Sequence, residues 1–344
     1  MKQLLTILKY GLLLALSGAL MVYAVRGQDL SRIGYYIRSA NYFWLGVTMT
    51  LSILGYLSRA YRWQMQLTAS RHKVPFWNVY HAMMVGYLAN IVLPRMGEVI
   101  RCSVLRRTSG VPVEVSLGTV ITERVIDVLV LALLLGSVLL LEFNKFWAFI
   151  QSLFVDKYDS LEANRGVLLA VVGIAGLLVL LFGYLLFRNL DKLRNNALFM
   201  KIVAFAKGLL AGVFSVMKLE NKGLFLLHTV FTWLVYYLMD YLAFKCFPET
   251  YTLDMKAGLA VLTFGAFGMA APVSGGIGVF HVMVQSTLLV YGISKEAGIA
   301  YALVVHGAQT ILVVFMGGIS FIASAIQSSK VPRPLAVEPV ASNS

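Results

Sequence analysis

The stretch NIVLPRMGEVIRCSVLRR, residues 90–107, follows an apolar run and decides how the chain can fold. The run stops at Pro94 and is followed within a few residues by Arg95, Glu98 and Arg101. Proline removes a backbone donor and disfavours a helical residue before it, so a helix is expected to end here. Either the chain leaves an apolar environment at this point, or these charges lie inside it for a purpose.

The rest of the chain is strongly apolar. Its 344 residues are 59% hydrophobic and 13% charged, and the mean hydropathy is +0.78. Soluble domains are about 45–50% apolar and about 25% charged, so the composition predicts a polytopic membrane protein. The 29 Lys and Arg outnumber the 16 Asp and Glu. In this setting the surplus predicts contact with anionic lipid headgroups, not with nucleic acid.

Apolar runs of about 20 residues are long enough to cross a bilayer. The candidate spans are residues 4–25, 42–60, 113–141, 166–187, 223–245 and 298–326. Two more apolar regions are interrupted, 76–107 at Pro94 and 256–292 at PVSGGIG, residues 272–278. Residues 328–344 are rich in Pro and Ser and are expected to be a disordered tail. We therefore expect a single transmembrane domain over residues 1–327.

Loop charge orients these segments, because cytoplasmic loops carry the excess of Lys and Arg. The basic loops 59–75 and 188–222 and the tail are expected in the cytoplasm, and the acidic loop 142–165 outside. This holds only if 76–107 and 256–292 each dip into the membrane and return. Arg26, Arg32 and Arg38 would then lie outside, against the rule.

The resulting order of segments repeats. Residues 4–141 and 166–326 would each contain span, span, hairpin and span, and an odd number of crossings inverts one half relative to the other. Inverted repeats with broken helices are typical of transporters. The predicted fold class is thus all-α: about six transmembrane helices plus two oppositely oriented re-entrant helical hairpins, with an inverted repeat. Both termini are expected in the cytoplasm, and the protein in the cell (inner or cytoplasmic) membrane.

The first break has the residues of a phosphate site. Pro94 and Gly97 would break the helix, and a new helix near Gly97 would direct its positive end at a ligand. Arg95 and Arg101 offer forked donors for phosphate oxygens, and Glu98 could hold an arginine or meet a headgroup amine. The alternative is a cytoplasmic loop with snorkelling arginines.

A second charged motif, ERVID at 123–127, lies within an apolar run. Each charge at the bilayer centre costs on the order of 2.5–3.5 kcal/mol even on the lenient insertion scale. Glu123 and Asp127 share a helix face, and Arg124 could reach inward or across to Glu98. We expect this cluster to face the protein interior, either as part of a binding site or as a structural ion network.

The second break, PVSGGIGVFH at 272–281, resembles a phosphate cradle after Pro272. Gly275, Gly276 and Gly278 permit close backbone approach and expose N–H groups ahead of a helix. No Gly-Lys-Ser/Thr follows, so it is not a P-loop. A turn needed only for tight packing is the alternative.

Scattered polar residues complete the predicted intramembrane network. They are Asn90, Glu123, Asp127, Asp240, His281, His306 and Gln309. A lone histidine in a membrane is either a hydrogen-bonded core residue or a proton carrier. No HExxH, GxSxG, Walker A or Cys/His metal spacing occurs, so we expect no metal, no cofactor and no enzymatic activity.

Together, NIVLPRMGEVIR, ERVID and PVSGGIGVFH resemble the lysylphosphatidylglycerol synthase transmembrane family, or flippase-like membrane proteins, over roughly residues 5–326. RAYRW, residues 59–63, resembles the basic and aromatic end of the family's second helix. The resemblance implies translocation of an anionic or aminoacylated phospholipid, or of a lipid-linked headgroup, between leaflets. The residues in matching motif positions are Arg95, Glu98, Arg101, Glu123, Arg124 and Asp127.

Two features separate this chain from family members that synthesise lipids. Those members carry a C-terminal soluble aminoacyltransferase domain, whereas a short tail ends this chain, so synthesis is not expected. His281 stands where many relatives are expected to have an acidic residue, which leaves the headgroup and any proton coupling open.

Three functions therefore remain in view. The first is lipid translocation, with membrane phospholipids or a lipid-linked substrate as partner. The second is an intramembrane enzyme that modifies a lipid phosphate with Glu123 or Asp127 as base. The third is a non-transporting partner subunit. A homo-oligomer or a separate lipid-synthesising enzyme is the candidate protein partner.

Overall fold

A computed structural model describes residues 2–162 and 219–330, and in these ranges every regular element is a helix. The first range contains α1 (Lys2–Val25), α2 (Leu30–Ser39), α3 (Tyr42–Ala69), α4 (Phe76–Val92), α5 (Gly97–Ser109) and α6 (Val113–Glu162). The second contains α10 (Lys222–Ala243), η1 (Phe244–Cys246), α11 (Met255–Ala270), η2 (Ser274–Gly276), α12 (Val279–Val290) and α13 (Lys295–Lys330). The all-α class predicted from the sequence is confirmed for this part of the chain.

Three of these helices are long and apolar enough to cross a membrane. They cover Val113–Phe149, Lys222–Cys246 and Lys295–Ser329. Many large apolar side chains on them face outward, including Leu133, Leu140 and Phe315. Outward apolar side chains on long helices are what a lipid environment requires. The expected span 166–187, most of the loop 188–222 and residues 331–344 of the tail lie outside the described residues.

The expected acidic loop 142–165 is wrong, because α6 continues to Glu162. Its backbone leaves helical geometry only at Glu142, with φ −128° and ψ 20°. The Glu142 side chain is buried and pairs with Lys145 at 2.9 Å and with Lys256 of α11 at 3.5 Å. The chain from Glu142 to Glu162 is therefore helical and not a loop, and Glu142 helps join α6 to α11.

The expected loop 59–75 needs a similar correction. Helix α3 runs to Ala69, so Arg59 and Arg62 are helical, and both are buried. Only Arg71 and Lys73 lie in the turn before α4. The helix continues because the two arginines find carboxylate partners inside the bundle, as described below.

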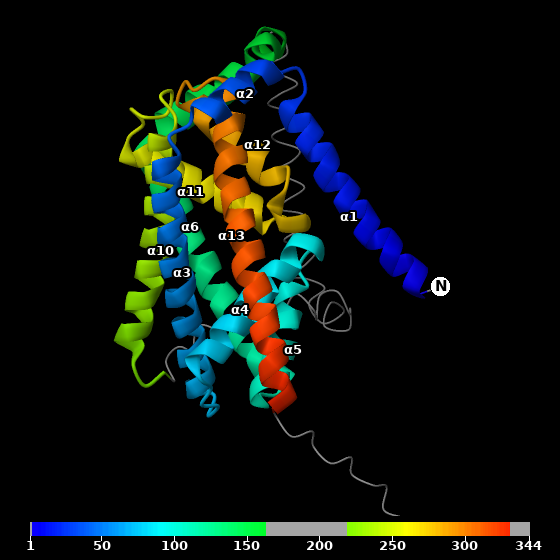
Figure 1. The fold of residues 1–344 in the computed structure, drawn as a ribbon. Coiled ribbons are helices and arrows are strands. Elements are labelled where there is room, and N and C mark those ends of the chain that lie inside the picture. The colour runs from blue at the N-terminus through cyan, green and yellow to red at the C-terminus, as the bar shows by residue number, and fades with distance from the viewer. Residues whose placement is uncertain (1, 163–218, 331–344) are drawn as a thin grey trace, which may run out of the picture.

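A short helix, α2, lies between the first two long helices, where no helix was predicted between the spans 4–25 and 42–60. Asp29 caps its start, because the carboxylate accepts from the N–H groups of Ser31 and Arg32. Ile33 and Tyr36 are buried against the bundle. Figure 1 shows α2 across the end of the bundle where α1 stops and α3 begins.

The two interrupted regions form two helix pairs. α4 packs on α5, and α11 packs on α12. In the first pair the backbones touch: a Cβ on Gly97 would clash with the carbonyl oxygen of Gly86 and lie 2.6 Å from Asn90 Cγ. In the second, a Cβ on Gly268 would lie 2.7 Å from Phe280 Cα. Small residues at membrane helix contacts allow this close approach.

Two buried clusters hold the bundle together at different places. One surrounds Trp63, Met83 and Leu105 where α3, α4 and α5 meet. The other surrounds Phe244, Phe247 and Tyr301, and it includes the inward face of α2. α3 also packs along α10, and α13 along α4, which ties the chain's two described ranges into one bundle (Figure 1).

Candidate functional site

A network of arginines and carboxylates lies inside the bundle where α3, α5 and α6 meet. Helix spacing gathers its members: Arg59 and Arg62 are three residues apart on α3, and Glu123 and Asp127 four apart on α6, so each pair shares a face. Arg101 of α5 adds a third guanidinium group. Side-chain exposure is 0% for Arg62, 2% for Arg101 and 1% for Glu123.

Glu123 is the centre of the network. Its Oε1 accepts from Arg59 Nε at 2.7 Å and Arg59 Nη2 at 2.5 Å, and lies 3.4 Å from Arg62 Nη2. Its Oε2 accepts from Arg101 Nη2 at 2.9 Å. Charge-assisted bonds of this kind are about twice as strong as neutral ones. One carboxylate therefore joins the helices α3, α5 and α6.

Asp127 supplies the second negative charge. Arg59 Nη2 donates to its Oδ2, and Arg62 Nη2 donates to its Oδ1, each at 2.8 Å. Arg124 approaches both carboxylates at longer range, 3.7 Å to Glu123 and 3.6 Å to Asp127. The Arg124 side chain is 39% exposed, so it forms the open edge of the network.

Neighbouring side chains fix the arginines in place. The Arg101 guanidinium lies 4.5 Å from the centre of the Trp63 ring, and Trp63 Nε1 donates to Thr119 Oγ1 at 2.9 Å. Arg59 Nη1 donates to the hydroxyl of Tyr236 on α10 at 3.2 Å. Aromatic and hydroxyl partners of this kind hold guanidinium groups in one orientation while leaving their charge uncompensated.

The network is not fully satisfied. Four guanidinium groups face two carboxylates. Buried nitrogens without a hydrogen-bond partner are Arg62 Nε, Arg101 Nε, Arg101 Nη1 and Arg124 Nε. Buried charged groups normally find such partners, so the unused donors mark positions where an anionic group could accept.

The first break stands beside this network. Pro94 is buried and ends α4, and Asn90 Oδ1 accepts from the N–H of Gly97, the first residue of α5, at 2.7 Å. The predicted break at Pro94 and Gly97 is therefore present, and Asn90 acts as its cap. The left-handed backbone of Arg95, with φ 64°, places an exposed non-glycine residue in the turn.

The predicted phosphate residues of this segment occupy different environments. Arg101 belongs to the network, whereas Arg95 is exposed and makes no ion pair within the described part of the chain. Glu98 is partly buried, and its Oε2 has no hydrogen-bond partner. The ion pairs of Arg124 are with Glu123 and Asp127, and none joins it to Glu98.

The second break is neutral. Gly275, Gly276 and Gly278 all have positive φ, from 56° to 85°, which side chains other than glycine rarely adopt. His306 Nε2 bonds the Gly275 carbonyl oxygen at 2.9 Å, and the Gly278 N–H donates to His281 Nδ1 at 3.3 Å. The ring centres of His281 and His306 are 4.9 Å apart.

The polar backbone of this turn is largely used by the protein itself. The Ser274 N–H donates to Ser17 Oγ of α1 at 3.3 Å, and a Cβ on Gly278 would lie 2.5 Å from Leu20 Cβ. These contacts fit the packing alternative for the glycine turn better than an open cradle after Pro272, which is exposed.

The two breaks approach each other, but their polar groups do not merge. A Cβ on Gly275 would lie 3.7 Å from Ile91 Cα, so the glycine turn reaches the end of α4. Within residues 2–162 and 219–330, no hydrogen bond or ion pair connects the arginine network to the turn. The structure therefore places the predicted headgroup residues Arg95, Arg101 and Gly276 in three surroundings.

Gln309 joins helices through its side chain, whereas the contact of Asp240 is made by its backbone. Gln309 of α13 donates to Ser52 Oγ at 2.7 Å and accepts from the Tyr56 hydroxyl at 3.3 Å. The Asp240 carbonyl oxygen accepts from the Tyr301 hydroxyl at 2.9 Å. In the described residues, no group of three or more His, Cys, Asp or Glu side chains could hold a metal ion.

Two residues at the heart of the site were missed in the sequence. Arg59 and Arg62 were assigned to a cytoplasmic loop because they follow an apolar run. A signal was present: RAYRW spaces the arginines three apart beside Trp63, which is helical spacing. Two carboxylates buried in ERVID also require cationic partners, and Arg124 alone cannot supply both.

Comparison with known proteins gives one finding. The family model described as "Lysylphosphatidylglycerol synthase TM region" matches residues 10–317. Neither a curated protein nor a solved structure matches significantly.

Proposed function

We propose that this chain, which belongs to the lysylphosphatidylglycerol synthase TM-region family, is a translocase that moves a lipid between leaflets. The family makes it a membrane protein concerned with lipid modification or translocation. The substrate we propose is an anionic or aminoacylated phospholipid, or a lipid-linked headgroup. Its phosphate would bind at the arginine network while its tails stay in the bilayer.

The observation that carries the proposal is the charge of the network. Four arginines against two carboxylates leave two positive charges uncompensated in a largely buried place. An uncompensated buried charge is costly, and a phosphate group would remove that cost while accepting from the unused donors. Arginine suits this task because its planar fork matches phosphate oxygens.

Access to the network is from its edge. Arg124 is the most exposed of the four arginines, and Asp127 beside it is 15% exposed. A headgroup arriving from the lipid side would meet Arg124 first and would then reach the unused nitrogens of Arg101 and Arg62. The headgroup would thus meet the weakly paired arginine before the strongly paired ones. It can therefore enter without first breaking the strongest ion pairs.

We place the chain in the cell membrane with the end carrying Arg71, Lys73, Arg106 and Arg107 in the cytoplasm, by the positive-inside rule. The α4–α5 and α11–α12 pairs would then be re-entrant hairpins entering from opposite sides. With about six full spans this gives the inverted repeat of residues 4–141 and 166–326 and cytoplasmic termini. Short helices paired across a polar break support this arrangement.

We do not assign the chain an enzymatic role, a cofactor or a protein partner. Glu123 and Asp127 would be the candidate bases for chemistry on a lipid phosphate. Both accept from guanidinium groups at 2.8–2.9 Å or closer, which engages them as counter-ions and not as proton acceptors for a substrate.

Leaflet exchange of labelled lipid in reconstituted vesicles tests the proposal. Arg124→Ala is expected to slow exchange about tenfold or more, since it removes a charged hydrogen-bond donor to phosphate. Arg107→Ala, an exposed arginine of α5 outside the network, is the matched control and should keep the wild-type rate.

The assay also separates the rival functions. Equal exchange by wild type, Arg124→Ala and protein-free vesicles would overturn translocation and favour a partner subunit. Formation of a modified lipid in detergent micelles, where leaflets do not exist, would favour an enzyme. Melting curves of both variants guard against loss of fold.

A further inference from the structure

Helix α2 combines a buried face with a basic, aromatic outer face. Ile33 and Tyr36 point into the bundle, while Leu30 and Tyr35 are both 66% exposed. Arg32 and Arg38 are exposed on the same helix. Because Leu30 and Tyr35 stand exposed beside these arginines, the outer face offers both apolar surface to acyl chains and charge to headgroups, which suits a helix at a membrane surface.

The position of α2 agrees with a location at the membrane–water interface. It lies across the end of the bundle where α3 begins (Figure 1). Aromatic residues gather there: the Tyr42 hydroxyl donates to the Ile37 carbonyl oxygen, and Phe43 is 70% exposed. Tyr and Trp rings collect at the level of lipid headgroups, so this end of the bundle is expected to meet the headgroup layer.

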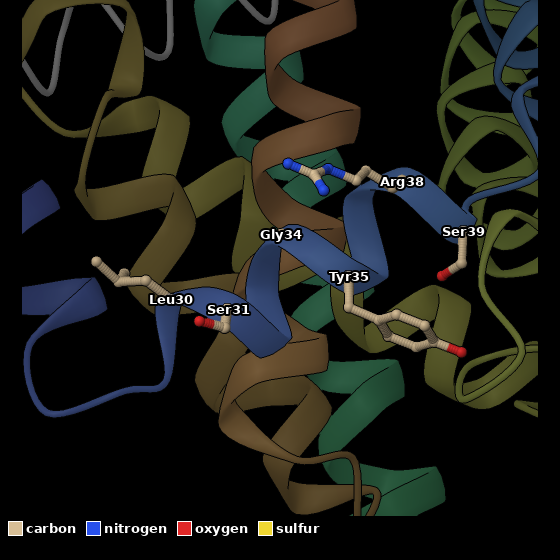
Figure 2. Close-up of a pocket in the computed structure, with 6 residues that line it drawn as sticks. All are labelled: Leu30, Ser31, Gly34, Tyr35, Arg38 and Ser39. Atoms are coloured by element: carbon tan, nitrogen blue, oxygen red, sulfur yellow. The ribbon is translucent and has the colours of Figure 1, made fainter.

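A hollow of about 540 Å³ lies along the outer side of α2. It is lined by Leu30, Ser31, Gly34, Tyr35, Arg38 and Ser39. Figure 2 shows the Arg38 and Tyr35 side chains leaving the helix on either side of Gly34. A Cβ on Gly34 would meet nothing within 4 Å, so the floor is open. All six lining residues belong to one helix, so a headgroup would lie against this hollow and would not be enclosed by it.

The charges around this hollow are unbalanced. Within the described residues, Arg26, Arg32 and Arg38 form no ion pair. Asp29, the carboxylate that directly precedes α2, is used to cap this helix. The hollow thus offers a cation and the hydroxyls of Ser31 and Tyr35 beside an exposed leucine, which complements an anionic headgroup above an acyl chain. The Ser39 hydroxyl donates to the Tyr36 carbonyl oxygen instead.

We propose that this hollow binds the phosphate of an anionic phospholipid in the leaflet opposite to the one nearest the arginine network. The stretch of α3 from Tyr42 to Arg59 rises about 26 Å at 1.5 Å per residue. The hydrocarbon core is about 30 Å thick. The two cationic sites therefore lie about one hydrocarbon thickness apart, one for each headgroup layer.

This site is distinct from the one that carries the proposed function, and it requires only that α2 lie at the membrane surface. Given the translocation proposed above, a phospholipid held here would be either waiting to enter the protein or just released from it. Its occupant is distinguished from a free anion by the neighbouring Leu30 and Tyr35, which offer apolar surface for the glycerol backbone and acyl chain.

Photo-crosslinking of the full chain in phosphatidylcholine vesicles tests the site directly. The probe is phosphatidylglycerol with a photoreactive group near its phosphate, and mass spectrometry locates the labelled segment. Crosslinking to residues 28–41 is expected to saturate. Arg38→Gln is expected to raise the half-saturating probe level about tenfold, since it removes a charge-assisted hydrogen bond from the hollow to the phosphate. Gly34→Leu, which fills the hollow without changing charge, should do the same.

Arg32→Gln is the matched control, because it removes the same charge from the same helix but does not line the hollow. It is expected to change half-saturation less than twofold. A zwitterionic phosphatidylcholine probe should label this segment weakly. Equal effects of Arg38→Gln and Arg32→Gln would overturn the proposal, because attraction would then be diffuse. Displacement of the probe by inorganic phosphate would also overturn it.

The result is independent of transport. Labelling of residues 28–41 should be the same in wild type and in Arg124→Ala, whether or not exchange is slowed. A failure at α2 is therefore read from the crosslinked segment, and a failure of the proposed translocation from the exchange rate.

Discussion

The α4–α5 pair and the α11–α12 pair each consist of two helices joined by a break that contains a proline and glycine. In the first pair, α5 carries Arg101 into a network of guanidinium and carboxylate groups, in which four buried nitrogens have no partner. In the second, His281 and His306 each bond a glycine of the turn, and no charge is present in the break itself. A similar break between two packed helices thus occurs in two different chemical environments.

This difference suggests a separate role for each helix pair. Unused buried donors are tolerated where a ligand supplies the missing acceptors, which supports the binding role proposed for the surroundings of the first pair. A turn whose N–H and carbonyl groups are bonded internally has less to offer a ligand. The second pair is therefore the structural counterpart, which supports the end of α4 through the contact of Gly275 with Ile91.

The largest effect is expected from Glu123→Ala. The change leaves Arg59, Arg62 and Arg101 buried with one carboxylate between them, and loss of one partner from a buried ion network costs about 3–5 kcal/mol. The free energy of unfolding in mixed micelles measures it. Glu114→Ala, an exposed acid on the same helix, should stay within about 0.5 kcal/mol of wild type. A loss below 1 kcal/mol for Glu123→Ala would show that the network is not the centre of this region.

Part of the difference between the two helix pairs can be predicted from the sequence. Pro94 and the glycines at 275–278 predict the breaks. Proline lacks the backbone N–H that a helix needs, and glycine readily adopts the positive φ of a turn. ERVID predicts a buried cluster, because three charges in an apolar run must find partners. The sequence does not say which partners, since Arg59 lies 64 residues from Glu123 and only the packing of α3 on α6 joins them.

The same limit explains the errors in the predicted loops. Counting Lys and Arg near helix ends treats every such residue as solvated, and Arg62 is instead fully buried. Glu142 was read as the start of an external acidic loop, whereas Lys256 from a distant helix helps compensate its charge. Pairing between distant segments decides both cases, and it cannot be read from local composition.

A middle effect is expected where each pair is packed most tightly, at Gly97→Ala and Gly268→Ala. A methyl group at Gly97 would clash with Gly86, and one at Gly268 would press on the backbone of Phe280. Overpacking of this kind costs about 1–3 kcal/mol in the free energy of unfolding. Because each pair brings its two helices together at a glycine, both variants should lose stability.

Gly118→Ala on α6 is the control for this pair of variants. Its added methyl group meets nothing within 4 Å, so it should gain about 0.5–1 kcal/mol from helix propensity. If only one of the two packing variants loses stability, the two helix pairs are not packed in the same way. The statement that both pairs depend on a close glycine contact would then be wrong.

The smallest effect is expected in the second pair, at His281. His281→Leu removes the acceptor of the Gly278 N–H, and an unsatisfied backbone donor costs about 1 kcal/mol or somewhat more. His281→Asn should recover most of that loss, because its side-chain oxygen stands where Nδ1 stood and accepts the same bond. If this turn is structural, lipid exchange by both variants at a permissive temperature should remain within about twofold of wild type. Loss of exchange with unchanged stability would instead assign a direct part in transport to the second pair, and the division of roles between the two pairs would then be wrong.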